Sequence, residues 1–182
     1  MRIVLQDASV TLRPFAPEDF EVLWREETRD RGDFETPWAS DDDRAKERVR
    51  ARVEHSGTWR DGRVLDLAVM VDGELAGDVQ ARRDPAYAPT GLFDLGIGLF
   101  AARRGRGVGT TAIRLLTAFL FDEERAVRVT LSTDLDNAAM QRVAEKAGFT
   151  QEGIMRGFWI VPDGPARDYA LYARTRADHE AG

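Results

Sequence analysis

The feature that most constrains the fold is a glycine-rich turn that lies between an apolar segment and an amphipathic helix. Residues 92–100 are largely apolar and are predicted to form a buried strand. Gly105, Gly107 and Gly109 follow, and residues 108–121 then place apolar side chains on one face of a predicted helix. Backbone N–H groups are exposed at a helix N-terminus, where the helix dipole is also positive, so this turn is predicted to bind phosphate.

Two other phosphate-binding motifs do not fit this turn. A P-loop needs a lysine followed by serine or threonine after its last glycine, whereas Thr110-Thr111 follows Gly109 without a lysine. A dinucleotide fingerprint has the pattern G-x-G-x-x-G, and Thr110 occupies the position of its last glycine. No second βαβ unit is predicted beside the turn, which also argues against a dinucleotide-binding fold.

Charge and composition narrow the class of protein. The formal net charge is −6, which disfavours nucleic-acid binding. Within this acidic chain, Arg103, Arg104 and Arg106 cluster where no acid lies between Asp94 and Asp122, which fits either a specific anionic ligand or a solvated loop. No cysteine is present, so disulfides and thiolate metal sites are excluded. The sequence has no apolar run of the ~18 residues that a membrane-spanning helix needs and no export signal, so we expect a cytoplasmic protein without membrane contact.

The remaining segments predict a sheet that is covered by helices. Strands are expected from alternating or apolar runs, at residues 9–14, 64–71, 74–82, 92–100, 126–132, 149–160 and 167–175. Helices are expected from about 17 to 27, 40 to 55, 108 to 121 and 137 to 147. This order predicts one α/β (α+β) domain over residues 1–182, with a mixed, mostly antiparallel sheet of about seven strands and about four flanking helices.

The glycine-rich turn also carries a family resemblance. Arg104-Gly105-Arg106-Gly107-Val108-Gly109 resembles the Q/R-x-x-G-x-G/A signature with which GNAT acetyltransferases hold the pyrophosphate of coenzyme A. The segment from Asn137 to Phe149 resembles the N-x-x-S…E-K-x-G-F segment of the ribosomal-protein N-terminal (Rim-type) acetyltransferase branch. Segments 12–19 and 168–172 also resemble that branch, so the similarity covers about residues 9–175.

The resemblance implies the GNAT fold and an enzyme that transfers an acetyl group from acetyl-CoA to a primary amine by direct attack in a ternary complex. A backbone N–H near Leu99 would polarise the thioester oxygen. Asn137 would contact the coenzyme, although a helix cap explains it equally well. The residues that the resemblance assigns to coenzyme binding are Leu99, Phe100, Ala101, Arg104, Gly105, Arg106, Gly107, Val108, Gly109, Thr110 and Asn137.

The resemblance also nominates residues for proton transfer and for the acceptor. Asp94 matches the acidic position of the family's fourth strand and is the candidate general base, against the alternative of a polar residue at a strand edge. Phe34 and Trp38 are candidates for acceptor contact, against ordinary packing. Many members carry a general-acid tyrosine where this chain has Ala144, and the branch commonly has serine where it has Met140. Three tyrosines or water remain as alternative donors: Tyr87, Tyr169 and Tyr172.

The sequence leaves the acceptor and the partners open. A protein N-terminus and a small-molecule amine both fit, and no metal site is predicted, since His55 and His179 lack a ligand pattern. The strands beside the last hairpin are candidates for a homodimer contact. A non-catalytic acyl-CoA-binding or sensor protein of the same fold is the alternative function, and Ala144 and Met140 are the residues that favour it.

Overall fold

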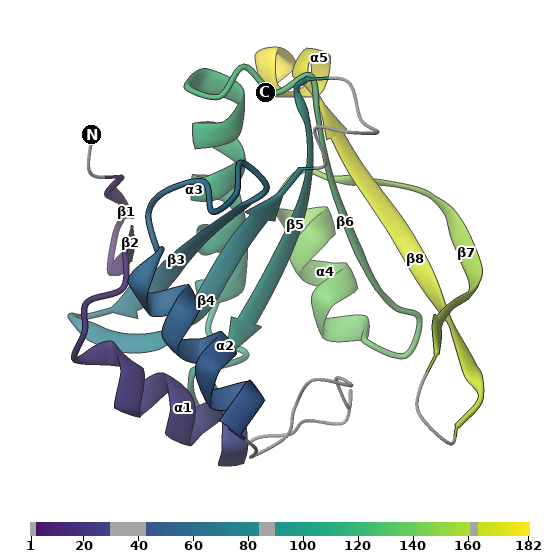
Figure 1. Ribbon diagram of the computed structural model, residues 1–182. Coiled ribbons are helices and arrows are strands. Elements are labelled where there is room, and N and C mark those ends of the chain that lie inside the picture. Colours follow the sequence, from purple (N-terminus) through teal and green to yellow (C-terminus); the bar gives the residue numbers. More distant parts are fainter. Residues whose placement is uncertain (1–2, 30–42, 84–89, 161–163) are drawn as a thin grey trace.

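The computed structural model describes residues 3–29, 43–83, 90–160 and 164–182 of the chain. Its strands form one sheet in the order β1-β2-β3-β4-β5-β6-β8-β7, in which the pairing is antiparallel except between β5 and β6 (Figure 1). The prediction of a mixed, mostly antiparallel sheet is therefore confirmed. The strands are β1 (Leu5–Asp7), β2 (Val10–Arg13), β3 (Val64–Val71), β4 (Glu74–Arg82), β5 (Leu92–Leu99), β6 (Arg128–Asp134), β7 (Thr150–Ile160) and β8 (Ala166–Thr175).

Helices cover both faces of this sheet (Figure 1). One face packs against α1 and α2, where Leu23, Val49 and Ala68 belong to a small apolar cluster. The other face packs against α3 and α4 and carries the larger core, to which Leu116 and Val129 belong. Within the described ranges, no helix has both the length and the apolarity to cross a membrane. The helices are α1 (Asp19–Arg29), α2 (Asp43–Glu54), α3 (Val108–Asp122), α4 (Ala138–Lys146) and α5 (Arg176–Ala181), with a 3-10 turn η1 (Ala101–Arg103).

The parallel strands β5 and β6 pair over only part of their length. Their ladder ends at Leu95 and Leu131. β5 continues beyond this point to Leu99, while β6 continues to Asp134 in pairing with β8. The two strands diverge from there, as their separating lower ends in Figure 1 show. Residues 92–95 are called the paired half of β5 below, and residues 96–99 its open half.

The structure adds two elements to those that the sequence predicts. β1 is a three-residue strand that joins the sheet through a turn at Ala8, where φ is 50°. So short a strand offers too little alternation to be recognised. α5 begins with a capping box, in which the side chains of Thr175 and Asp178 each bond to the backbone N–H of the other residue. The other elements lie where the sequence predicts them, with ends that shift by a helical turn or less.

Candidate active site

The glycine-rich turn places a helix N-terminus beside open space. Gly105 and Gly107 have φ values of 74° and 81°, in the left-handed region that glycine adopts most readily. A Cβ atom at either position would have no other atom within 4 Å. Gly107 is the N-cap of α3 and contributes no side chain, so the first N–H groups of the helix are available to a ligand. The turn therefore has the shape and the donors that an anion requires.

The three arginines of the turn have different surroundings. Arg103 forms an ion pair with Glu74 of β4. The Arg104 Nε atom donates a hydrogen bond to the Leu99 carbonyl at 2.9 Å, which ties the turn to the end of β5. Arg106 is exposed, and no ion pair joins it to any residue that the structure describes. The positive charge of Arg103 is thus partly balanced within the protein, whereas Arg106 can contribute its charge to an anion site.

The open half of β5 presents unpaired backbone groups toward β6. The Phe100 N–H donates to the Ala76 carbonyl of β4 at 2.9 Å, so in this antiparallel ladder the even-numbered residues of β5 bond to β4. The N–H and C=O groups of Ile97 and Leu99 therefore point away from β4, toward the side where β6 has diverged. Of these groups, the Leu99 carbonyl already accepts the hydrogen bond from Arg104. An extended ligand can bond to such an edge as a strand would.

Side chains from three elements close this end of the sheet. A Cβ atom on Gly109 would lie 3.5 Å from Val143 of α4 and 3.6 Å from Leu99 of β5. The side chain of Asn137 caps α4 by accepting a hydrogen bond from the Met140 N–H at 3.0 Å. The start of α3, the end of β5 and Val143 of α4 thus lie together.

The candidate base Asp94 lies in the paired half of β5. Its Oδ2 atom accepts a hydrogen bond from Arg82 Nη2 at 2.7 Å, and its Oδ1 atom accepts one from Thr130 Oγ1 at 3.2 Å. About 42% of its side chain is exposed, so water reaches the carboxylate. Gly96 and Gly98 follow on the same face of the strand, because side chains alternate along it. This is the face that α1 and α2 cover, since Asp78 pairs with Gly98 and contacts Arg52 of α2.

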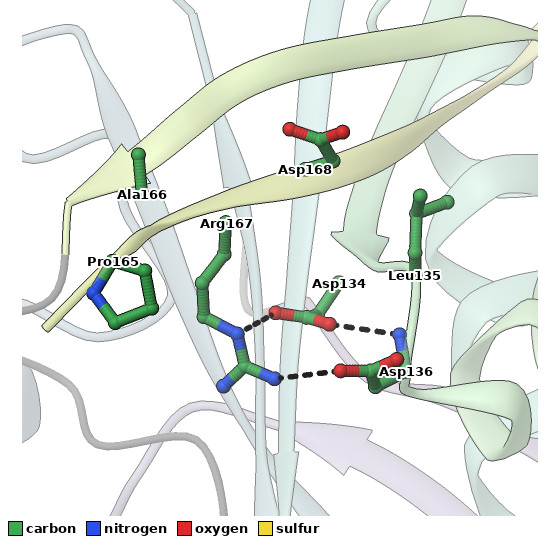
Figure 2. A pocket seen from close by; sticks show the side chains of 7 residues that line it. All are labelled: Asp134, Leu135, Asp136, Pro165, Ala166, Arg167 and Asp168. Carbon is green, nitrogen blue, oxygen red and sulfur yellow. Dashed lines mark hydrogen bonds and ion pairs between the residues drawn. The ribbon is translucent and has the colours of Figure 1, made fainter.

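A pocket of about 510 Å³ lies on the same face, at the ends of β6 and β8 (Figure 2). Arg167 lies between two carboxylates, with 2.5 Å from its Nε to Asp134 Oδ2 and 3.3 Å from its Nη2 to Asp136 Oδ2. Asp168 also belongs to the lining, but its carboxylate points away from Arg167 and accepts a hydrogen bond from the Gly157 N–H at 2.7 Å (Figure 2). The pocket carries more negative than positive charge because Asp134 and Asp136 face a single arginine. The sequence did not predict this pocket, although Asp134 and Asp136 shortly after a predicted strand are a visible signal.

Two tyrosines that were candidates for proton donation lie on opposite faces of β8. Tyr169 shares its face with Asp134, and burial together with this carboxylate raises its pKa, partly opposed by Arg167. Tyr172 is fully buried on the α3–α4 face, and its hydroxyl has no hydrogen-bond partner among the described residues. Burial and then Glu145 raise the pKa of Tyr172. Both side chains are therefore protonated at neutral pH.

Other residues from the sequence analysis are not brought into this site. Phe34, Trp38 and Tyr87 lie outside the described residues. His179 of α5 contacts Asp122 of α3 at 2.9 Å, far along the chain from the turn. In the described part of the chain, no group of three or more histidine or acidic side chains is arranged to hold a metal ion.

Comparison with known proteins identifies the family. The profile of the acetyltransferase (GNAT) domain matches residues 9–150. The kanamycin resistance protein of Rhizobium radiobacter is 32% identical over 82 residues, which are 43% of this chain and 72% of that protein.

Solved structures share the fold over nearly the whole chain. The microcin C7 self immunity acetyltransferase MccE, in complex with acetyl-CoA and AMP, superposes with a TM-score of 0.78 at 21% identity, over 93% of each chain. The ribosomal L7/L12 alpha-N-protein acetyltransferase RimL, in complex with coenzyme A, has a TM-score of 0.78 at 18% identity, over 95% of this chain and 98% of RimL. The profile match and the shared fold show that this chain belongs to the GNAT family and is an N-acetyltransferase that uses acetyl-CoA.

Proposed function

We propose that the protein transfers the acetyl group of acetyl-CoA directly to a primary amine, which binds on the face of the sheet that α1 and α2 cover. The observation that carries this proposal is the open half of β5. It joins an unpaired backbone edge to a helix N-terminus whose glycines leave room for phosphate. Few binding sites other than one for an extended thioester with a pyrophosphate would use both features together.

The coenzyme is assigned to the residues that the sequence predicts. The first N–H groups of α3, at Val108, Gly109 and Thr110, would hold the pyrophosphate, with charge from Arg104 and Arg106. The N–H group of Leu99, and the adjoining Phe100 and Ala101, would hold the arm that carries the thioester. Asn137 can serve as a helix cap and still lie beside that arm. When bound, acetyl-CoA supplies an activated acetyl carbon.

Asp94 is proposed as the base that receives the proton of the acceptor ammonium group. At about 3.3 Å per residue, its Cα atom lies about 13 Å from that of Gly98, so water must carry the proton between the open half and the carboxylate. The exposed part of Asp94 supports this route. Arg82 and Thr130 fix the carboxylate in place through one oxygen each.

The protein does not need a strong acid for the leaving group. Ala144 and Met140 cannot donate a proton. A thiol with a pKa near ~8.5, as in cysteine, leaves readily as the thiolate. We therefore propose that the sulfur departs unprotonated or takes a proton from water.

The acceptor is proposed to be a cationic primary amine. The acidic pocket around Asp134, Asp136 and Asp168 supports this, as does the net charge of −6. Kanamycin, named in one relative, is a polycationic amine, and RimL is named for a protein N-terminus, so both classes remain acceptors to test. Phe34 and Trp38 are still proposed as acceptor contacts.

The experiment is an assay of thiol release from acetyl-CoA with a panel of amines. The panel contains kanamycin, spermidine, a peptide with a free N-terminus and free amino acids, and each product is identified by mass spectrometry. We expect at least one cationic amine to be acetylated. The dependence of its rate on the concentrations of both substrates should fit a ternary complex, rather than the ping-pong kinetics of an acetylated enzyme. Tight binding of acetyl-CoA with no turnover across the panel would favour the non-catalytic alternative instead.

A further inference from the structure

A second carboxylate lies closer to the open half of β5 than Asp94 does. Asp78 of β4 pairs with Gly98, and only 8% of the residue is exposed. A Cβ atom built on Gly98 would lie 3.0 Å from Asp78 Oδ1. The carboxylate therefore covers the position where β5 lacks a side chain, between Ile97 and Leu99 of the open half.

The two oxygens of Asp78 differ in their partners. Asp78 Oδ2 lies 2.8 Å from Arg52 Nη2 and 3.4 Å from Gln80 Nε2. Asp78 Oδ1 accepts no hydrogen bond from any residue that the structure describes. In Asp94, by contrast, both oxygens accept hydrogen bonds. The Asp78 side chain is 12% exposed, so its free oxygen can reach water, and the donor of a ligand can take the place of that water.

The charges around Asp78 also favour a cation. Arg52 lies among three carboxylates, since it forms an ion pair with Glu27 and lies 3.7 Å from Asp66 and 2.8 Å from Asp78. Arg60 adds a second positive charge, 3.3 Å from Asp66. We call these five side chains the Arg52 group. With all five ionised, the group carries one negative charge in excess, while Arg48 and Arg82 outside the group also act on Glu27 and Asp66. Burial raises the pKa values of Glu27 and Asp66 despite these arginines.

We propose that Asp78 binds the ammonium group of the acceptor through its free oxygen, and so holds the nitrogen beside the open half of β5. This inference rests on the proposed acetyl transfer to an amine. It gives the two carboxylates different tasks, because Asp78 binds the charged acceptor and Asp94 receives its proton through water. It also explains Gly98, since any side chain there would cover the free oxygen.

The test compares Asp78→Asn with Asp66→Asn, using the amine that the parent acetylates fastest. Both changes neutralise a buried carboxylate beside Arg52, but only Asp78 faces Gly98. An ionic hydrogen bond of ordinary strength corresponds to ~10–100-fold in affinity, so we expect Asp78→Asn to raise the amine KM by about that factor. Asp66→Asn removes the same charge from the Arg52 group without facing Gly98, so it measures the effect of charge alone and should raise the amine KM by no more than about threefold. Calorimetric titration should give the parental Kd for acetyl-CoA in both variants.

A second pair of variants covers the case in which Asp78→Asn does not fold, as thermal unfolding would reveal. Gly98→Ala places a methyl group against the free oxygen and should also raise the amine KM, whereas Gly153→Ala, in β7 with open space around it, should not. An amine KM within twofold of the parent in folded Asp78→Asn, or in Gly98→Ala, would overturn the inference. A parent that acetylates no amine would instead overturn the proposed function.

Discussion

The two halves of β5 differ in what lies beside them. In the paired half, β6 completes the ladder, and both oxygens of Asp94, on the face that α1 and α2 cover, accept hydrogen bonds. In the open half, β6 has diverged, glycines replace side chains, and the nearest carboxylate keeps one oxygen free. One strand thus holds the Asp94 carboxylate in place at one end and has an edge without a neighbouring strand at the other.

This difference shows how a sheet can combine rigidity with room for two substrates. Asp94 is held by Arg82 and Thr130 from the two neighbouring strands, so its position does not depend on a ligand. The open half can accept the coenzyme along its edge and the amine over its face, because a strand has edges and faces at right angles. Substitutions in each half should therefore change different steps of the reaction.

The largest effect is expected at the paired half. Asp94→Asn should lower turnover by ~10²–10⁴-fold, the usual contribution of a general base, while the Kd for acetyl-CoA stays unchanged. The defect should shrink at high pH, where the free amine already dominates: near ~8 for an α-amine and near ~10.4 for a lysine-like amine. Steady-state rates across pH measure this. Equal rates for variant and parent at neutral pH would remove Asp94 from the mechanism and leave Asp78, Glu152 or solvent as the proton acceptor.

The next effect is expected at the turn that follows the open half. Gly107→Val should weaken acetyl-CoA binding by ~10–100-fold in a calorimetric titration, because a branched side chain would fill the space left for phosphate. Gly62→Val is the matched control, since Gly62 also has a positive φ of 67° and open space but lies in the turn before β3. Both variants carry backbone strain, so a loss of affinity in Gly107→Val alone assigns the site. Parental affinity in folded Gly107→Val would place the pyrophosphate elsewhere.

A smaller effect is expected from the arginines of the turn. Replacing Arg104 and Arg106 by Gln should weaken acetyl-CoA binding by several-fold at low salt, and should flatten the loss of affinity as salt is added. Arg103→Gln should leave the salt dependence unchanged, because Glu74 already pairs with Arg103. Titrations at several ionic strengths check this. The same slope in the double variant and the parent would show that these two side chains do not meet the anion.

The smallest effect is expected in the free energy of unfolding, whose pH dependence should differ between carboxylates near the two halves. Burial raises the pKa of Glu27, in the Arg52 group beside the open half, above its ordinary value of 4.5. The folded state therefore holds this proton more tightly than the unfolded chain does, and stability is lost as pH rises above 4.5 through the raised pKa. Urea unfolding should show that Glu27→Gln flattens this decline.

Glu152 provides a control of opposite sign. It pairs with Arg128, which lies opposite the start of the paired half, and the hydrogen bond from Arg128 lowers its pKa below 4.5. The contribution of Glu152 to the stability of the folded state is present above pH 4.5 and is lost as pH falls through the lowered pKa. Glu152→Gln should therefore leave the decline above pH 4.5 in place. A decline that persists in Glu27→Gln would mean that the proton is held elsewhere.

The sequence predicts the fold and the turn well, because both depend on residues that are close together in the chain. Apolar periodicity identifies α3 and β4 directly, and Asp72-Gly73 predicts the hairpin between β3 and β4. The turn is read from a few consecutive residues, of which Gly107 is the N-cap of α3 in the structure.

The partners of the carboxylates could not be predicted in this way. Asp78 lies beside Gly98 only because of the register between β4 and β5, and Arg52 reaches it from a helix that precedes both strands. A visible signal existed, since Asp66 and Asp78 interrupt strands that are otherwise apolar, and buried acids require partners. The identity of those partners depends on packing between distant segments, which no local pattern encodes.

The position of β8 in the sheet means that part of the sheet cannot form until late in synthesis of the chain. β8 lies between β6 and β7, so β7 has no partner in the sheet, and β6 has an exposed edge, until residues 166–175 have left the ribosome. The helices and strands of the first half can form earlier through contacts nearer in sequence. The late insertion of one strand therefore completes the half of the sheet that holds the acidic pocket. Until then the nascent chain exposes two unpaired strand edges, at which aggregation or capture by a chaperone would begin.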